Sequence, residues 1–432
     1  MNKVISIIFI FCAGILHSQQ TPAPVQTSSI AIKGAKAHIG NGKIIKNSLI
    51  LFENGVLNYV GNNNDRDLSN HLVIEAFGKN VYPGFIIPNS TLGLIEIDAV
   101  RASDDVSEIG KWNPHIRSLI AYNTESRVVE TMRPNGVLIA QITPRGGVIS
   151  GRSSIVQLDA WNWEDAVIRT DEGIHMNWPN NYSYGNWWKG EDPGLKINDK
   201  YVDKVNDIEN YFNNVKAHIS KYNNKTNLPF ESMKQLLNNN MRLYIHVDDK
   251  KGIIDAVTLF KNHGINKITI VGGYESHKIS DFLVNNNISV LLKRVHSRPE
   301  KNDDDYDLPY KLAKKLVDAG ITVALEASGD MERMNSRNLP FYAGTTVSYG
   351  LTKEQALQLI TLNTAKILGI DQNYGSLEVG KSATLFISEG DALDMRTNKL
   401  LKAFIDGREI SLESHQTKLW RRYSKKYQTP IK

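Results

Sequence analysis

From Val81 to Leu94 the chain reads VYPGFIIPNSTLGL. The apolar run Phe85-Ile86-Ile87 follows a Pro-Gly pair, a pattern typical of a fully buried first strand in a parallel sheet. Residues that follow such a strand lie at its carboxyl end, which is where a β/α barrel carries its chemistry. Asn89 and Thr91 come directly after the apolar run, so we expect both side chains at that edge.

The same stretch resembles the first barrel strand of the amidohydrolase superfamily, in particular of its imidazolonepropionase-like branch. In that branch the strand reads Pro-Gly-Phe-Ile-Asp-x-His-x-His, and the two histidines bind metal. Residues 83–86 match the motif, whereas Ile87 stands at the aspartate position and Asn89 and Thr91 stand at the histidine positions. A second family marker, GSLEVGK, begins at Gly375. The resemblance extends over nearly the whole mature chain.

Length and resemblance together predict an α/β fold, a TIM-like (β/α)8 barrel with a small β-sandwich domain built from both termini. A chain of 432 residues with 41% hydrophobic residues can hold one large barrel and a smaller domain. Residues 28–80 and 375–410 carry short β-patterned runs separated by glycines, and the resemblance implies that they form the sandwich. Residues 81–374 are the expected barrel, and residues 411–432 are an expected helical tail.

Within the barrel, strand-like and helix-like segments alternate, which indicates a parallel sheet. The expected strands cover residues 82–88, 136–142, 154–158, 173–177, 242–247, 267–271, 289–294 and 322–326. The expected helices cover residues 208–220, 229–238, 252–262, 276–285, 308–319 and 353–362. Thr352 and Gln355 predict a capping box for the last of these helices.

The first 18 residues have the pattern of a signal peptide, with Lys3 before the apolar residues 4–16 and a small residue, Ser18, before the expected cleavage. The apolar run is shorter than the ~20 residues of a spanning helix, so export to the periplasm or the extracellular space is favoured over a membrane anchor. Cys12, the only cysteine, lies in this segment, so we expect a mature protein without disulfides. Residues 19–27 are an expected linker.

The resemblance implies zinc or another divalent metal, bound by residues from barrel strands 1, 5, 6 and 8 and often by a lysine or glutamate from strand 4. His246 stands at the strand 5 ligand position. Gly272-Gly273 replaces the usual Glu-His-Gly after strand 6, and Ser328 replaces the strand 8 aspartate. A lone imidazole does not hold zinc in a closed site. The sequence therefore predicts a degenerate or rebuilt metal site in which His246 is the remaining metal ligand.

A rebuilt site has two kinds of candidate residue. His246 paired with Glu326 or Asp330 could supply an acid and a base without a metal. The candidate substrate-binding residues are Asn89, Thr91, His115, Arg145 and Arg337, where an arginine could clamp a carboxylate in a bidentate pair. The alternatives are structural: a buried, hydrogen-bonded histidine at His115 and a salt bridge or helix cap at Arg337.

The resemblance implies hydrolysis of carbon–nitrogen bonds other than peptide bonds in a small substrate, which the arginines suggest is anionic. The alternative is a catalytically inactive binding or partner subunit that keeps the barrel as a scaffold. A homo-oligomer, or an assembly with a related amidohydrolase subunit, is compatible with either hypothesis. The net charge of +5 is small and dispersed for this length, so we expect no nucleic-acid partner, and we expect no membrane span in the mature chain.

Overall fold

The computed structural model describes residues 21–185, 187–192, 194–220, 226–329 and 331–428. The expected signal peptide and the start of the linker lie outside these ranges, as does Asp330. Within them, every helix is too short or too polar to cross a lipid bilayer. Export of the protein stays a prediction.

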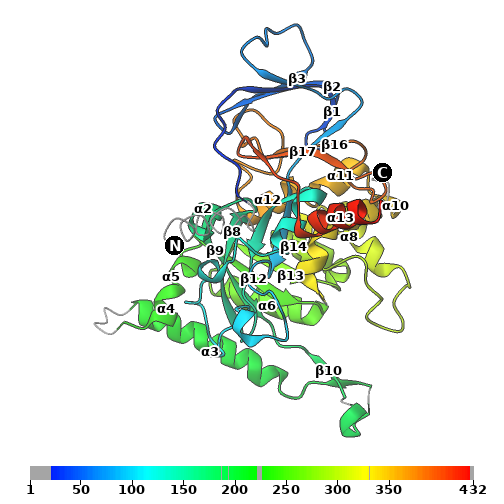
Figure 1. Cartoon of the computed structure of the whole chain (residues 1–432). Coiled ribbons are helices and arrows are strands. Elements are labelled where there is room, and N and C mark those ends of the chain that lie inside the picture. The colour runs from blue at the N-terminus through cyan, green and yellow to red at the C-terminus, as the bar shows by residue number, and fades with distance from the viewer. Residues whose placement is uncertain (1–20, 186, 193, 221–225, 330, 429–432) are drawn as a thin grey trace, which may run out of the picture.

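Eight strands form a nearly closed, TIM-like barrel sheet, with sequence-distant strands lying side by side below the β-rich unit in Figure 1. In spatial order they are β6 (Phe85–Ser90), β7 (Val137–Ile142), β8 (Ile149–Gln157), β9 (Val167–Asn177), β12 (Arg242–Val247), β13 (Ile268–Gly272), β14 (Ser289–Leu292) and β15 (Val323–Leu325). Each expected strand is found close to its expected place, because long apolar runs bounded by glycines identify buried strands well.

A short loop segment bridges the gap between the first and last barrel strands. Leu325 donates its backbone N–H to the carbonyl of Leu359 at 3.1 Å, and Ile86 donates to the carbonyl of Ile360 at 2.9 Å. The expected helix over residues 353–362 is therefore wrong in its second half. It ends as α11 (Lys353–Gln358) and resumes as α12 (Leu362–Leu368), because the backbone between them bonds to β15 and β6. The predicted capping box at Thr352 and Gln355 is confirmed.

Strand β8 runs antiparallel to both β7 and β9, which corrects the expected strict alternation of strand and helix. Only residues 143–148 connect β7 to β8, and so short a connection permits a hairpin but no crossover. Gly146 and Gly147 make the turn with φ of +83° and +62°. The second to fourth barrel strands thus form a meander, with the four-residue helix α2 (Trp163–Ala166) before β9.

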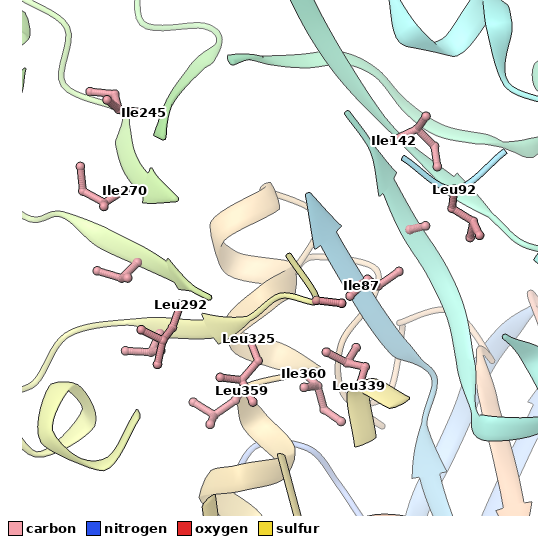
Figure 2. Packing of buried hydrophobic residues seen from close by; sticks show 14 of the residues in the cluster. Ile87, Leu92, Ile142, Ile245, Ile270, Leu292, Leu325, Leu339, Leu359 and Ile360 are labelled. Carbon is pink, nitrogen blue, oxygen red and sulfur yellow. The ribbon is translucent and has the colours of Figure 1, made fainter. Parts of the chain in front are cut away.

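Alternate strand residues face the two sides of the barrel wall. The outward-facing residues are apolar and pack in one core beneath the helices, as Figure 2 shows for Ile87, Ile142, Ile245, Ile270, Leu292 and Leu325. The covering helices include α3 (Tyr201–Ser220), α6 (Lys250–Asn262), α7 (Ser280–Asn285), α8 (Leu308–Asp318) and α10 (Leu339–Ser348). Where one helix was expected over residues 229–238, two short ones form, α4 (Leu228–Ser232) and α5 (Lys234–Leu237).

A separate β-rich unit at one end of the barrel combines strands from both ends of the chain (Figure 1). Its strands are β1 (Ile30–His38), β2 (Ile44–Glu53), β3 (Val56–Asn62), β4 (Leu72–Glu75), β5 (Asn80–Pro83), β16 (Leu385–Ser388), β17 (Leu400–Ile405) and β18 (Arg408–Ile410). Antiparallel pairing of β5 with β16 joins the two ends, and Gly84 alone separates β5 from β6. The predicted domain boundaries stay a prediction. The helix α13 (His415–Lys426) follows.

Candidate active site

The inside of the barrel changes from apolar to polar along its axis. A lower layer of inward-facing residues is apolar and includes Ile86, Ile139, Ile155 and Ala324. Two residues further toward the carboxyl end of the parallel strands, the inward positions are polar: Gln141, Ser153, His246 and Glu326. This polar layer lies at the edge where barrels of this kind carry their chemistry.

Asn89, just before the end of β6, connects three other polar groups of this layer. Its side-chain Nδ2 donates to Glu326 Oε2, its backbone N–H donates to Gln141 Oε1 at 2.8 Å, and its carbonyl accepts from Arg145 Nη2 at 2.8 Å. Its φ of +51° is left-handed, a conformation that asparagine tolerates better than most residues. The Asn89 Oδ1 atom is buried and has no hydrogen-bond partner within the described part of the chain.

Glu326, the residue after β15, is a strongly perturbed carboxyl of the site. It is 1% exposed. Burial raises the pKa of Glu326 to about 7, against hydrogen bonds from Ser328 and Asn89 and the charge of Arg145, which lower it. Glu326 can therefore hold or release a proton near neutral pH, which an ordinary carboxyl group cannot do.

Arg145 supplies positive charge to the same layer from the turn between β7 and β8. Burial lowers the pKa of its guanidinium, and the carboxylates of Glu332 and Glu326 counteract part of that effect. Burial and the charge of Arg145 together lower the pKa of His246 to about 3, so this imidazole is neutral. The cation in this site is consequently an arginine side chain.

Thr91 is bonded to a residue that the sequence analysis did not single out. Glu332, at the start of α9 (Glu332–Asn335), accepts from the Thr91 hydroxyl at 2.7 Å and from its backbone N–H at 3.0 Å. The hydroxyl proton of Thr91 is thereby directed to Glu332, and the substrate-binding role of Thr91 stays a prediction. Glu332 follows β15 in a short helix, and no sequence motif marks it as a functional residue.

His246 contacts a different partner from the one expected. Its Nε2 lies 3.0 Å from Nδ1 of His175 on β9, and His175 Nε2 lies 3.0 Å from Ser153 Oγ on β8. The expected pairing of His246 with Glu326 is not formed, and Asp330 lies outside the described residues. Both His246 and Glu326 instead lie within the electrostatic influence of Arg145.

Glu172 on β9 ends this chain of contacts, and sequence reasoning missed it together with Gln141 and Ser153. Its Oε1 accepts from Ser153 Oγ at 2.5 Å and from Gln141 Nε2 at 2.5 Å, and its Oε2 accepts from Tyr244 Oη at 2.9 Å. Burial raises its pKa, while these three donors lower it. Glu172 and His175 lie three residues apart in β9, a spacing that ordinarily places side chains on opposite faces of a strand, so the sequence pattern did not single out Glu172.

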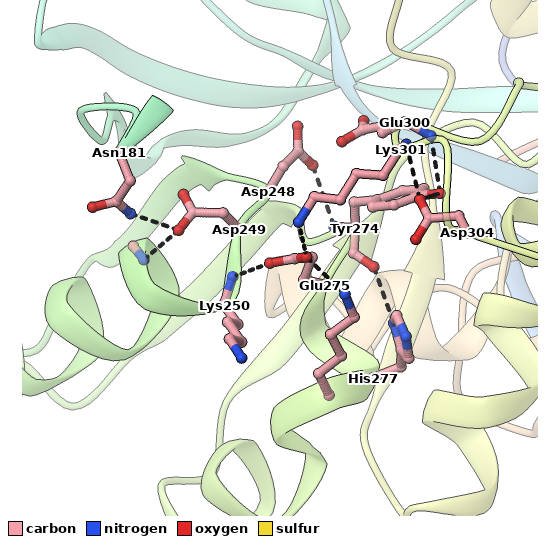
Figure 3. A network of polar contacts seen from close by, with 12 residues as sticks. Asn181, Asp248, Asp249, Lys250, Tyr274, Glu275, His277, Glu300, Lys301 and Asp304 are labelled. Carbon is pink, nitrogen blue, oxygen red and sulfur yellow. Dashed lines mark hydrogen bonds and ion pairs between the residues drawn. The ribbon is translucent and has the colours of Figure 1, made fainter. Parts of the chain in front are cut away.

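A second polar network occupies the carboxyl ends of the next strands (Figure 3). Asp248 accepts from Lys293 Nζ at 3.0 Å and from the backbone N–H of Tyr274 at 3.2 Å. A Cβ atom at Gly272 would lie 2.6 Å from Asp248 Oδ1. Asp248 thus fills the space beside Gly272-Gly273, where the resembling family has a histidine.

Two predicted substrate-binding residues lie apart from this layer. Arg337 is exposed, and its carbonyl accepts from Asn135 Nδ2 at 2.8 Å. Asn135 precedes β7, so the Arg337 backbone lies near the amino end of that strand, and the substrate-binding role of its side chain stays a prediction. His115 lies in a segment that pairs with β8, and its Nδ1 is buried without a partner among the described residues.

The described residues do not fit a divalent metal at the implied place. Within the described ranges, no group of three or more His, Cys, Asp or Glu side chains could hold a metal ion. Asn89 and Thr91 are instead engaged by Glu326 and Glu332, and His246 by His175. No reaction step is therefore derived through a metal.

Comparison with known proteins agrees with this architecture. The amidohydrolase family model matches residues 312–410. Imidazolonepropionase of Flavobacterium psychrophilum is 27% identical over 187 residues, which cover 39% of this chain and 46% of that enzyme. Imidazolonepropionase of Picrophilus torridus is 22% identical over 408 residues, which cover 86% of this chain and 94% of that enzyme.

Among solved structures, a crystal structure of an amidohydrolase from Thermotoga maritima matches with a TM-score of 0.76 and 24% identity, over 88% of this chain and 99% of that one. That likeness shows the fold. Together, the family model and the imidazolonepropionase relatives support the identification of the chain as an amidohydrolase superfamily, imidazolonepropionase-like member. The match to the Flavobacterium psychrophilum enzyme spans less than half of that enzyme's length, at 46%.

Proposed function

We propose that the protein hydrolyses a carbon–nitrogen bond other than a peptide bond in a small, anionic substrate, with Glu326 as the proton carrier and Arg145 as the adjacent positive charge. The observation that supports this most is the state of Glu326. It is a buried carboxyl with a pKa of about 7, it is held by Asn89, and it lies at the carboxyl end of a barrel strand. Perturbed carboxyls in such positions are recurrent acid–base catalysts.

In the proposed reaction Glu326, as carboxylate, takes a proton from the water that attacks the carbonyl carbon. The oxygen of that carbonyl gains negative charge, which the guanidinium of Arg145 stabilises. Glu326 then gives its proton to the departing nitrogen as the carbon–nitrogen bond breaks. The products are a carboxylic acid and an amine, so water is the only co-reactant and the carboxyl returns to its starting state.

Arg145 suits this role because its carboxylate neighbours only partly neutralise it. It donates to the carbonyl oxygens of Asn89 and Thr143, at 2.8 and 3.4 Å, and makes no ion pair within 4.0 Å among the described residues. Arg145 is a partly exposed residue, and a guanidinium held in this way attracts a carboxylate of the substrate as well as the developing oxyanion. This dual attraction underlies the proposed preference for anionic substrates.

A binding subunit without catalysis is the second candidate. It is favoured by the substitution of the implied metal ligands, since Asn89, Thr91 and Ser328 stand at those positions. It is also favoured by the way in which Thr91 and His246 bond to neighbouring side chains. Under this hypothesis the barrel binds a small anion at Arg145 and leaves it unchanged.

The test is a hydrolysis screen of the purified mature chain with small cyclic amides and N-acyl amino acids, each with and without a free carboxylate. Product amine and carboxylic acid are both quantified, after dialysis of the protein against a chelator. Hydrolysis of the carboxylated compounds that is lost in Glu326→Gln and kept in the surface control Glu409→Gln supports the proposal. Binding of those compounds without product, abolished in Arg145→Met, would instead establish the binding subunit.

A further inference from the structure

Buried side chains on β8 and β9 form a hydrogen-bond chain that takes no part in the reaction proposed above. It runs from Glu172 through Ser153 and His175 to His246, with contacts of 2.5, 3.0 and 3.0 Å. Glu172, Ser153 and His175 are 3%, 0% and 0% exposed, whereas His246 is partly exposed. The chain thus connects the closed interior of the barrel to the polar layer.

We propose that Glu172, acting through Ser153 and His175, fixes the His246 ring in the tautomer with its proton on Nε2. His246 then presents Nδ1 as a hydrogen-bond acceptor to the substrate. Glu172, Ser153 and His175 are positioning residues, and His246 orients an N–H or O–H group of the substrate. The catalytic part of this inference rests on the proposed function, whereas the tautomer does not.

The donor-to-acceptor direction of this hydrogen-bond chain follows from the groups that can donate to Glu172. Its two oxygens face the Ser153 hydroxyl, the Gln141 amide and the Tyr244 hydroxyl, all of which can donate. The orientation of Gln141 is set independently, because its Oε1 accepts the backbone N–H of Asn89 at 2.8 Å. As a carboxylate, the state that these three donors favour, Glu172 is the acceptor of all three groups.

Since the single hydroxyl proton of Ser153 is directed to Glu172, we assign Ser153 Oγ as the acceptor from His175 Nε2 at 3.0 Å, the shorter of the two contacts of that nitrogen, the other being with Gln141 Nε2 at 3.4 Å. A neutral imidazole carries one N–H, so His175 Nδ1 is left as an acceptor. The proton between the two histidines consequently belongs to His246 Nε2, at 3.0 Å. Burial and the charges of His246 and Arg145 keep the pKa of His175 well below its ordinary value, which agrees with a neutral ring.

The ring planes are held as well as the protons. His175 stacks on Tyr244 with ring centroids 4.4 Å apart and an interplanar angle of 11°. His246 is tilted against His175 at 55°, with 5.3 Å between centroids. No hydrogen bond to His246 Nδ1 forms within the described residues, and that atom is not among the buried unpaired ones. His246 Nδ1 is therefore an accessible acceptor in a fixed direction.

The tautomer is measured first, on the full mature chain labelled with ¹⁵N-histidine, by long-range ¹H–¹⁵N correlation at pH 7. For each neutral ring, the spectrum shows which nitrogen carries the proton. We expect both His175 and His246 to have the proton on Nε2, with assignments confirmed by His175→Gln and His246→Gln. A proton on His246 Nδ1 in the wild-type protein would overturn the proposal, whether or not any substrate is hydrolysed.

Glu172→Gln then tests the role of the carboxylate with almost no change of shape. A glutamine can donate to Ser153 Oγ, which reverses the chain and moves the His246 proton to Nδ1. The matched control is Tyr244→Phe, which removes one donor to Glu172 and leaves the direction of the chain unchanged. We expect the tautomer to switch only in Glu172→Gln. An unchanged His246 tautomer in that variant would contradict control by Glu172.

Activity gives a separate readout once a substrate is found. For histidines that bind metal, loss of the outer hydrogen-bond partner typically costs roughly 10- to 100-fold in metal affinity or activity, and we take that range as the scale for a misoriented His246. We expect a loss of that size in kcat/KM for Glu172→Gln, and a smaller one for Tyr244→Phe. Equal activity in the wild type and Glu172→Gln, with the tautomer switched as expected, would remove His246 from substrate orientation.

Discussion

The side-chain amide of Asn89 donates a hydrogen bond to the buried carboxyl of Glu326, and the backbone carbonyl of the same asparagine accepts from Arg145. One residue thus holds both the acid–base group and the fixed positive charge of the site. In the resembling family, the Asn89 position is a metal-binding histidine. An amide cannot replace that ligand, but it can orient a carboxyl, and this exchange underlies the predictions that follow.

Replacement of Glu326 with glutamine should slow hydrolysis strongly while the fold persists. The amide keeps the shape of the side chain but cannot accept a proton from water, and general acid–base groups contribute typically 10²–10⁴-fold to a rate. We expect kcat to fall by about that factor with KM changed little. Circular dichroism and Tm serve as the folding controls, and a variant that is fully active would rule out Glu326 as the proton carrier.

The free energy of unfolding should depend on pH between 4.5 and about 7 because of Glu326. Burial raises the pKa of Glu326 from its ordinary value of 4.5 to about 7, so the folded chain holds this proton longer than the unfolded chain does. Stability from this group is therefore present below pH 4.5 and is lost as pH rises through 7, by about 3 kcal/mol in total.

His246 works in the opposite direction. Its pKa is lowered to about 3, so the stability that it contributes is lost as the pH falls. The Glu326 effect is therefore measured as the difference in urea unfolding between the wild type and Glu326→Gln at each pH. We expect that difference to favour the variant increasingly up to about pH 7 and to level off above it. A pH-independent difference would mean that the carboxyl titrates normally.

Asn89→Gly should raise the pKa of Glu326 further. Glycine retains the left-handed backbone at φ +51° and removes only the side chain, so the hydrogen bond to Glu326 Oε2 is lost. A buried carboxyl that loses a donor favours its protonated form more strongly. The measurement is the ¹³C chemical-shift titration of the Glu326 carboxyl in both proteins, and a midpoint at or below the wild-type value would contradict this prediction.

Gly272→Ala should destabilise the barrel edge by on the order of 1–3 kcal/mol. Gly272 has a φ of +92°, and a Cβ there would lie 2.6 Å from Asp248 Oδ1. The matched control is Gly264→Ala, whose φ of +83° carries the same backbone strain with no atom within 4 Å of the added Cβ. Comparing the two Tm values isolates the displacement of Asp248. Equal decreases in Tm for the two variants would show that Asp248 moves aside without an energetic cost.

Arg145→Lys should keep part of the site's positive charge and lose its geometry. A lysine cannot reproduce the planar donor pattern that reaches the carbonyl of Asn89 at 2.8 Å. We expect Arg145→Met to lose binding of carboxylated compounds by roughly tenfold or more and Arg145→Lys to lose less. Isothermal titration with those compounds distinguishes the two, and unchanged affinity in Arg145→Met would place the anion elsewhere.

The barrel was predictable because its strands are long apolar runs between glycine turns, and all of them were found near their expected residues. The direction of β8 was not predictable in the same way, since it follows from the short connection of residues 143–148, whose length became known only once the strand bounds were known. The break in the helix that begins after Thr352 was not predicted for a related reason. The carbonyls of residues 359 and 360 accept hydrogen bonds from distant strands, and such a tertiary contact cannot be predicted from the local sequence pattern.

Within the site, the sequence pointed to Asn89, Arg145, His246 and Glu326 because each follows or ends a predicted strand. It missed Glu172 and Ser153. Charged and polar residues inside a strand normally face solvent on one side, and only the meander of β7, β8 and β9 turns these two toward the barrel interior.

The most direct test of the central claim is the pH dependence of kcat/KM for the best substrate of the screen, from pH 5 to 9. If Glu326 acts as the base, kcat/KM rises with a midpoint near its pKa of about 7 and reaches a plateau above it, and this profile disappears in Glu326→Gln. A profile that is flat across this range in the wild type, or identical in the variant, would contradict the account.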